Sequence, residues 1–102
     1  MGQGVDWRHG QGHMWDNHRV TTAEADEAIA DPDCVWMEPD PKSRSGDSIR
    51  VIGYSRTHGA VLTVILVRDP KVAWLWGANG WPSNATDRRA YGDDKEDDDG
   101  RD

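Results

Sequence analysis

The stretch from Ala60 to Val67 constrains the fold of this chain more than any other part of it. All of its residues except Thr63 are apolar, so an extended strand here has two apolar faces. Such a strand is typical of the centre of a sheet that is covered on both sides. The run covers eight residues, whereas a membrane-spanning helix needs about 20. The sequence therefore predicts a buried central strand and no membrane span.

A helix is predicted shortly before this strand. Thr21 and Glu24 have the spacing of a capping box, which satisfies two backbone N–H groups at the start of a helix. Apolar residues then recur at helical spacing as far as Ile29. The sequence Asp31-Pro32-Asp33 ends the helix, because proline disfavours helical backbone in the residue before it.

Further elements follow along the chain. Strands are expected at residues 34–37, 49–55, 61–67 and 72–76, and a last short helix is expected to begin at Ser83 or Asn84. This order predicts an α+β fold in one compact domain. Its parts are an N-terminal short helix, a three- to four-stranded antiparallel sheet and a C-terminal short helix.

Charge and glycine content divide the chain into three parts. Of the net charge of −7, five negative charges belong to residues 93–102, which contain no apolar residue and are expected to form a disordered acidic tail. Residues 1–13 are rich in glycine and are expected to form a flexible leader. The folded domain is then residues 14–92. Because this body is almost neutral, bulk charge does not favour non-specific nucleic-acid binding, although local basic patches are compatible with it.

The aromatic residues indicate which side chains fill the core, and the single cysteine narrows the classes of protein to which the chain can belong. Phenylalanine is absent and tryptophan occurs six times, so Trp36, Trp74 and Trp76 are expected in the core, and Trp81, between Gly80 and Pro82, partly exposed. One cysteine excludes a disulfide framework, and the polar N-terminus does not resemble a secretory signal, so we expect a cytoplasmic protein. The histidines and the cysteine lack metal-ligand spacing, and the sequence predicts neither a metal nor a cofactor.

The order of three stretches resembles the BrnT-like family, small toxins of bacterial type II toxin–antitoxin operons. These stretches lie between about Trp15 and Tyr91 and read DNHRVTTAEADEAIADPD, DPKSRSGDSIRVIGYSRTHGAVLTVILV and WPSNATDRRAY. The resemblance implies a fold similar to the RelE class of ribonucleases, metal-independent cleavage of RNA and inhibition by a cognate antitoxin protein. Because such complexes commonly bind their own operator, contact with DNA is expected only through the antitoxin.

The chemistry that the resemblance implies needs a proton-transfer group and cations near the phosphate. We assign proton transfer to His18, since imidazole takes up and releases protons near neutral pH. Arg50 and Arg88 are the expected catalytic cations. The expected RNA-binding residues are the basic side chains Lys42, Arg44 and Arg89, together with Trp81 and Tyr54 as stacking faces.

These candidates also have structural interpretations. In the structural interpretation, His18 has no role beyond packing against or capping the helix that follows it. Arg50 likewise has no role beyond an ion pair with a neighbouring acid. The two arginines of the last helix lie near its C-terminal end, where basic residues are favoured in any case. The basic residues of the loop after Pro41 fit a solvated loop equally well.

One stretch departs from the pattern of the family. Asn79-Gly80-Trp81-Pro82 lies where members typically carry Ser-Ala-Arg-Pro. An indole stacks on a base but does not neutralise a phosphate oxygen. This departure favours an alternative function, a catalytically inactive binding module that pairs with an antitoxin and takes part in operator regulation. A third alternative is an accessory protein of nucleic-acid processing whose acidic tail competes with phosphate.

Overall fold

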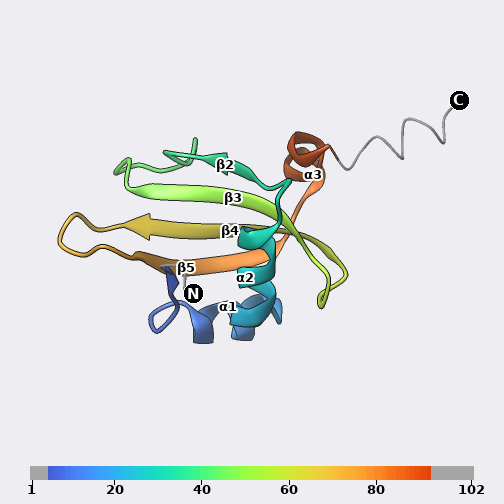
Figure 1. Cartoon of the computed structure of the whole chain (residues 1–102), viewed down its shortest axis with the longest axis horizontal. Coiled ribbons are helices and arrows are strands. Elements are labelled where there is room, and N and C mark those ends of the chain that lie inside the picture. Colours follow the sequence, from blue (N-terminus) through green and yellow to red (C-terminus); the bar gives the residue numbers. More distant parts are fainter. Residues whose placement is uncertain (1–4, 93–102) are drawn as a thin grey trace, which may run out of the picture.

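A computed structural model describes residues 5–92, which form a five-stranded sheet and three helices (Figure 1). In chain order the elements are β1 (Val5–Asp6), α1 (Gln11–His18), α2 (Thr22–Ala30), β2 (Val35–Met37), β3 (Ser48–Ser55), β4 (Ala60–Arg68), β5 (Leu75–Pro82) and α3 (Ala85–Tyr91). The strands lie in the order β1-β5-β4-β3-β2. β1 is parallel to β5 and the other neighbours are antiparallel. The α+β class expected from the sequence is confirmed.

The apolar run forms β4, the central strand of the sheet. It pairs with β3 along its whole length up to Val67 and with β5 on its other side. Leu62, Val64 and Leu66 are completely buried in the main hydrophobic core. The predicted central position of this strand is therefore confirmed, whereas the expected cover of both faces is found only in part: on the other face Val61 and Thr63 are buried, but Ile65 and Val67 are half-buried.

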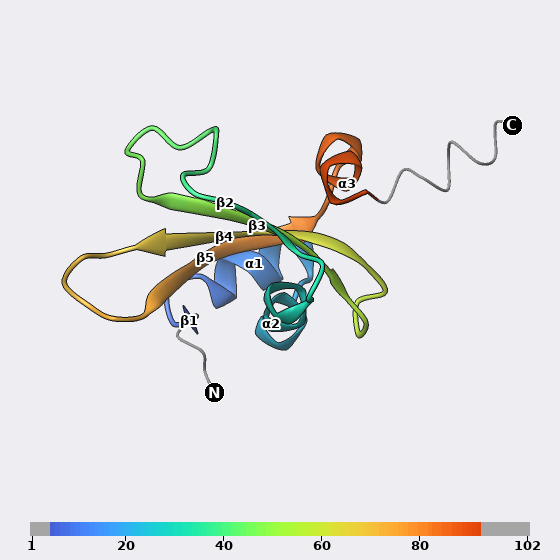
Figure 2. The ribbon, with the colours of Figure 1, turned by 45° about the horizontal axis from the view of Figure 1, so that its top comes forward.

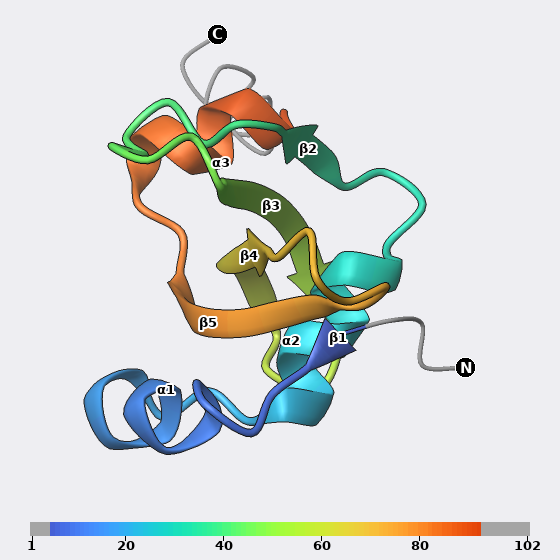
Figure 3. The same ribbon diagram turned by 90° about the vertical axis from the view of Figure 1, so that its left-hand side faces the viewer.

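The helices lie on both faces of the sheet. In Figure 2, α1 and α2 lie below the sheet, whereas α3 lies above one end of it. The end-on view in Figure 3 shows α1 next to β5, and α3 on the opposite side of the sheet near β2 and β3. Among residues 5–92, no helix is both long and apolar enough to cross a membrane.

α2 begins with the predicted capping box. The Thr21 hydroxyl oxygen accepts a hydrogen bond from the backbone N–H of Glu24 at 3.1 Å, and the Thr21 N–H donates to the Glu24 carboxylate at 2.9 Å. The helix ends at Ala30, before Asp31 and Pro32. Local signals at both ends were therefore sufficient to place this helix.

Residues 5–13 are not the flexible leader that their glycine content suggested. They contain β1 and the start of α1. Trp7 is only 8% exposed and packs in the core, and its indole N–H donates to Asp26 at 2.8 Å. Gly10 allows the backbone of this segment to approach β5 closely, because a Cβ at this position would lie 2.4 Å from the carbonyl oxygen of Gly77. The glycine that indicated flexibility instead allows this segment to pack against β5.

The last strand also differs from the prediction of residues 72–76. β5 begins at Leu75 and continues past Trp76 through Gly77 and Gly80 to Pro82. Gly77 lies under the ring of Trp7. A Cβ at this position would lie 2.2 Å from the ring carbon Cε3 of Trp7, so a larger residue would clash with the ring. Trp36 and Trp74, expected in the core, are 44% and 39% exposed. The predicted acidic tail, residues 93–102, lies outside the described residues.

Candidate functional site

Three of the predicted site residues, His18, Arg50 and Trp81, lie together at one end of β5. The ring centroids of His18 and Trp81 are 5.8 Å apart. The Arg50 guanidinium carbon lies 5.9 Å from the centre of the Trp81 ring. We call these three residues the Trp81 site.

The fold positions these side chains from three separate elements. His18 is the last residue of α1, which ends because Arg19 adopts a left-handed conformation with φ of 55°. Arg50 on β3 pairs with Ile65 of β4, and Trp81 on β5 pairs with Thr63. Because those two β4 residues are two apart, Arg50 and Trp81 project from the same face of the sheet.

Arg50 is held between two acidic residues. It is 7% exposed. Its Nε donates to Asp40 at 2.9 Å, and its Nη1 donates to Asp87 at 2.7 Å. The same Asp87 oxygen accepts from the Thr63 hydroxyl at 2.7 Å, and Thr63 also bonds to Ser83 at 2.7 Å. We call Arg50, Asp40 and Asp87 the ion triad.

The charges of the ion triad stabilise one another. Burial of Asp40 opposes its ionisation, but hydrogen bonds from Arg50 and from the backbone of Lys42 outweigh this effect and lower its pKa. Burial likewise disfavours charged Arg50, but Asp40 and Asp87 outweigh it and raise the arginine pKa. Two carboxylates thus neutralise the one guanidinium. Arg50 therefore makes the ion pairs that its structural interpretation expects. With both acids in contact, the guanidinium presents no unpaired charge to a phosphate.

The remaining predicted cations lie around α3 and the β2–β3 loop. Arg88 is half-buried, and its Nη1 donates to the backbone carbonyl of Ser83 at 3.2 Å. Arg89 is exposed on the same helix, and Arg44 is exposed in the loop. Lys42 lines a pocket of about 240 Å³ that also includes Arg50 and Asp87. The structure therefore brings Lys42 close to the ion triad.

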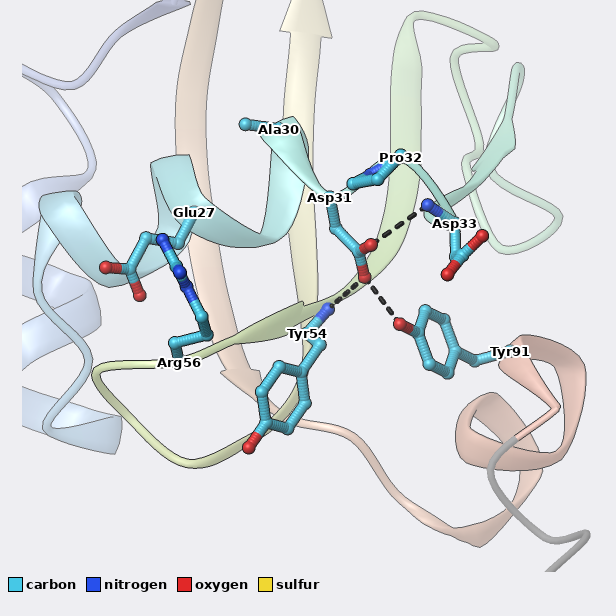
Figure 4. A pocket seen from close by; sticks show the side chains of 8 residues that line it. All are labelled: Glu27, Ala30, Asp31, Pro32, Asp33, Tyr54, Arg56 and Tyr91. Carbon is cyan, nitrogen blue, oxygen red and sulfur yellow. Dashed lines mark hydrogen bonds between the residues drawn. The ribbon is translucent and has the colours of Figure 1, made fainter.

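Tyr54 lines a different pocket, of about 510 Å³, four residues further along β3 than Arg50 (Figure 4). Its walls are formed by Glu27, Ala30, Asp31, Pro32, Asp33, Tyr54, Arg56 and Tyr91. Asp31 accepts hydrogen bonds from the Tyr54 backbone N–H at 2.8 Å and from the Tyr91 hydroxyl at 2.5 Å. Burial opposes ionisation of Asp31, but these bonds lower its pKa. With three carboxylates against one arginine, this pocket is unfavourable for RNA phosphates.

Glu27, at the edge of this pocket, ties α2 to the β3–β4 hairpin. Its carboxylate accepts from the Ser55 hydroxyl at 2.7 Å, the Thr57 N–H at 2.9 Å and the Thr57 hydroxyl at 2.6 Å. The bonds from Thr57 and Ser55 lower its pKa from 4.5 to about 2. The folded state therefore favours the ionised carboxylate.

These bonds predict a specific acid sensitivity. The stabilisation from Glu27 is fully present above its unfolded pKa and is lost as the pH falls from about 4.5 through about 2. Glu27→Gln should be less stable than the wild type at pH 7, and the difference should shrink by pH 2. Thermal unfolding at several pH values measures this. Thr57→Val, which removes one donor, should show the same trend more weakly. If the unfolding temperatures of the wild type and Glu27→Gln differed by the same amount at every pH, the stabilising role of the ionised Glu27 carboxylate would be contradicted.

Metal binding and sequence similarity add nothing to this site. Within residues 5–92, no group of three or more His, Cys, Asp and Glu side chains is arranged to hold a metal ion. Neither a model of a protein family nor a curated protein matches the sequence.

The chemistry available at the Trp81 site is proton transfer by His18 and stacking on the Trp81 indole. Sequence reasoning missed Asp40 and Asp87, since no local pattern links them to Arg50.

Proposed function

We propose that the protein is the toxin of a type II toxin–antitoxin pair of the BrnT-like class and cleaves RNA without a metal ion at the Trp81 site. One observation carries the proposal. A half-buried imidazole, His18, lies 5.8 Å from an indole ring that is also half-buried. A proton-transfer group and a face on which an unpaired base stacks are two of the groups that such cleavage uses.

In this proposal an unpaired base stacks on Trp81, and the adjoining ribose lies beside His18. His18 accepts the proton of the 2′-hydroxyl as that oxygen attacks phosphorus. The bond from phosphorus to the 5′-oxygen breaks, the leaving oxygen takes a proton from water, and His18 releases the proton it accepted to the solvent. The products are a 2′,3′-cyclic phosphate and a 5′-hydroxyl. The ion triad is assigned a positioning role, holding α3 and the loop before β3 next to Trp81.

Phosphate contacts are assigned to basic residues outside the ion triad. Lys42, Arg88 and Arg89 come from the loop before β3 and from α3, on the face of the sheet that carries Trp81. The expected partners are a cognate antitoxin and the RNA substrate, and operator DNA would be reached through the antitoxin. We place this activity in the cytoplasm, where both partners are made.

A cleavage assay tests the proposal. The purified chain, incubated with single-stranded RNA in EDTA, should release fragments that end in cyclic phosphate, as identified by mass spectrometry. His18→Ala should lower the rate by about 10²–10⁴-fold, the usual contribution of general acid–base catalysis. His13→Ala is the matched control, because His13 is an exposed histidine of the same helix. Cleavage by His18→Ala at the wild-type rate would exclude this mechanism.

The ion triad favours a second candidate, a binding module without catalysis. Asp40 and Asp87 neutralise the arginine that was expected to stabilise the reacting phosphate. In addition, Trp81 occupies the position where the family typically carries another arginine. This candidate predicts no turnover of any RNA by the wild type, together with a tight complex with a small protein encoded by the adjacent gene. Co-expression and co-purification with that gene product test it.

A further inference from the structure

Two indoles of β5, Trp76 and Trp81, project from the same face of the sheet. They are five residues apart, and in a regular strand an odd separation puts side chains on opposite faces. Trp76 pairs with Val67, and Trp81 pairs with Thr63, four residues away on β4. The register skips Ala78, and this bulge restores a common face. The irregularity thus directs both rings to one side.

The surroundings of Trp76 resemble those of Trp81. Each indole has one arginine and one histidine beside it. The His9 ring centroid lies 4.9 Å from that of Trp76, and the Arg8 guanidinium carbon lies 5.7 Å from the ring centre. The Trp76 indole N–H donates to Asp69 at 3.4 Å, and the Trp74 ring packs edge-on against Trp76 with 5.7 Å between the ring centroids. Both His9 and Arg8 are exposed.

The sheet surface between the two indoles is not covered by a helix of the described chain. Figure 2 shows α1 and α2 on the other face and α3 over one end only. Asn79 and Ile65 lie between the rings and are half-exposed. We call Trp76, Asn79 and Trp81, with the adjacent Ile65, the β5 strip. From the rise per residue of a strand, its two rings are about 15 Å apart.

We propose that the β5 strip binds single-stranded RNA, with one base on Trp81 at the cleavage position and another base on Trp76. This inference rests on the proposed function, which supplies RNA as the ligand class. The chemistry fits a single strand, because aromatic faces stack on any base. Arg50 is neutralised within the ion triad, so the attraction for phosphate is assigned to Arg8, whose side chain is 66% exposed although it pairs with Asp6 at 2.9 Å. The Asn79 amide, which offers both a donor and an acceptor, lies where an intervening base edge would pass.

The spacing of the indoles sets the length of the bound strand. Nucleotides stacked as in a duplex rise about 3.4 Å each along one strand. The two rings are then about four to five nucleotides apart, or fewer where the strand is extended. A trimer should therefore engage one indole, whereas an octamer should engage both.

Binding of fluorescently labelled 2′-O-methyl oligouridylates tests the inference. These oligonucleotides lack the 2′-hydroxyl that attacks phosphorus, so they bind without being cleaved. The octamer should bind at least tenfold more tightly than the trimer in fluorescence anisotropy. Trp76→Ala should weaken octamer binding by about tenfold, as is usual for loss of one stacking face. Trp36→Ala, which removes an exposed indole at the far edge of the sheet on β2, should leave the affinity unchanged.

The alternative outcomes separate the two proposals. If the octamer binds the wild type and Trp76→Ala behaves as Trp36→Ala does, the β5 strip is excluded while RNA binding at the Trp81 site stands. If neither oligonucleotide binds the wild type, both proposals fail. Should Trp76→Ala not fold by circular dichroism, the exposed pair Arg8→Gln and His9→Ala is used instead. This double variant should weaken octamer binding by about threefold and leave trimer binding unchanged, and an unchanged octamer affinity would overturn the inference.

Discussion

Arg50→Met should lower the free energy of unfolding by about 3–5 kcal/mol, the usual cost of removing one partner from a buried ion pair. The variant leaves Asp40 and Asp87 without the guanidinium that bonds to them at 2.9 Å and 2.7 Å. Both carboxylates are buried, so water replaces the lost hydrogen bonds poorly. Urea unfolding at pH 7, followed by circular dichroism, measures the loss.

The matched control is an exposed ion pair on the next strand. Arg68 of β4 bonds to Glu38 at 2.6 Å, but their side chains are 53% and 38% exposed. Arg68→Met should therefore cost less than about 1 kcal/mol. A triple variant that adds Asp40→Asn and Asp87→Asn to Arg50→Met should regain part of the lost stability, because it removes the buried charges. Equal losses for Arg50→Met and Arg68→Met would show that burial does not strengthen the ion triad.

This expected loss changes how Arg50 variants are interpreted. If the proposed RNA cleavage is found, its loss on replacing Arg50 would follow from a loosened α3 and β2–β3 loop as readily as from a missing catalytic cation. His18 is the better probe of mechanism, because it lies at the end of α1 and is only half-buried. The stability measurement on Arg50→Met therefore has to accompany any activity measurement on it.

Elements with local signals could be predicted from the sequence. α2 has a capping box at Thr21 and a proline after its last residue, and both act within a few residues of the helix end. The β3–β4 hairpin follows from two apolar runs around Gly59, whose φ of 77° suits a tight turn. These features are set by neighbouring residues, so the pattern of the sequence was sufficient.

Features set by distant partners were missed or misassigned. Arg50 and Asp87 are 37 residues apart, and only the folded sheet and α3 bring them together. Likewise, β5 was predicted to end at Trp76, before Gly77 and Gly80, although the strand continues through both glycines. The partners that fill the space over those glycines, Trp7 and Met14, are far away in the sequence. A glycine required for close packing cannot be distinguished by local pattern from one that favours a turn.

For the candidate site the same distinction holds. His18 and Trp81 were chosen separately for their chemistry, and the structure has them in contact across α1 and β5. Tyr54 was chosen in the same way, but it lines the acidic pocket beside Asp31. Residue type indicates which side chains can do the chemistry, whereas the register of the strands decides which of them meet.

The second large effect is expected at Trp7, in the segment whose composition suggested a leader. Trp7→Ala should lower the free energy of unfolding by about 3–5 kcal/mol, as is typical for removing a large buried aromatic side chain. Trp7 is 8% exposed, its ring covers Gly77 of β5, and its N–H bonds to Asp26 of α2 at 2.8 Å. The variant therefore leaves a cavity between β5 and α2 and removes a link between them.

Trp15→Ala is the control for this prediction, because Trp15 is 46% exposed on α1 and its ring lies beside Arg19. Losing that cation–π contact should cost no more than about 1 kcal/mol. Both variants are unfolded in urea. If the dependence of the unfolding free energy on urea concentration is unchanged, the losses at the two indoles can be compared directly. If Trp7→Ala were as stable as Trp15→Ala, the segment before α1 would contribute little to the fold. Gly77 would then lack the packing reason that the Trp7 ring gives for it.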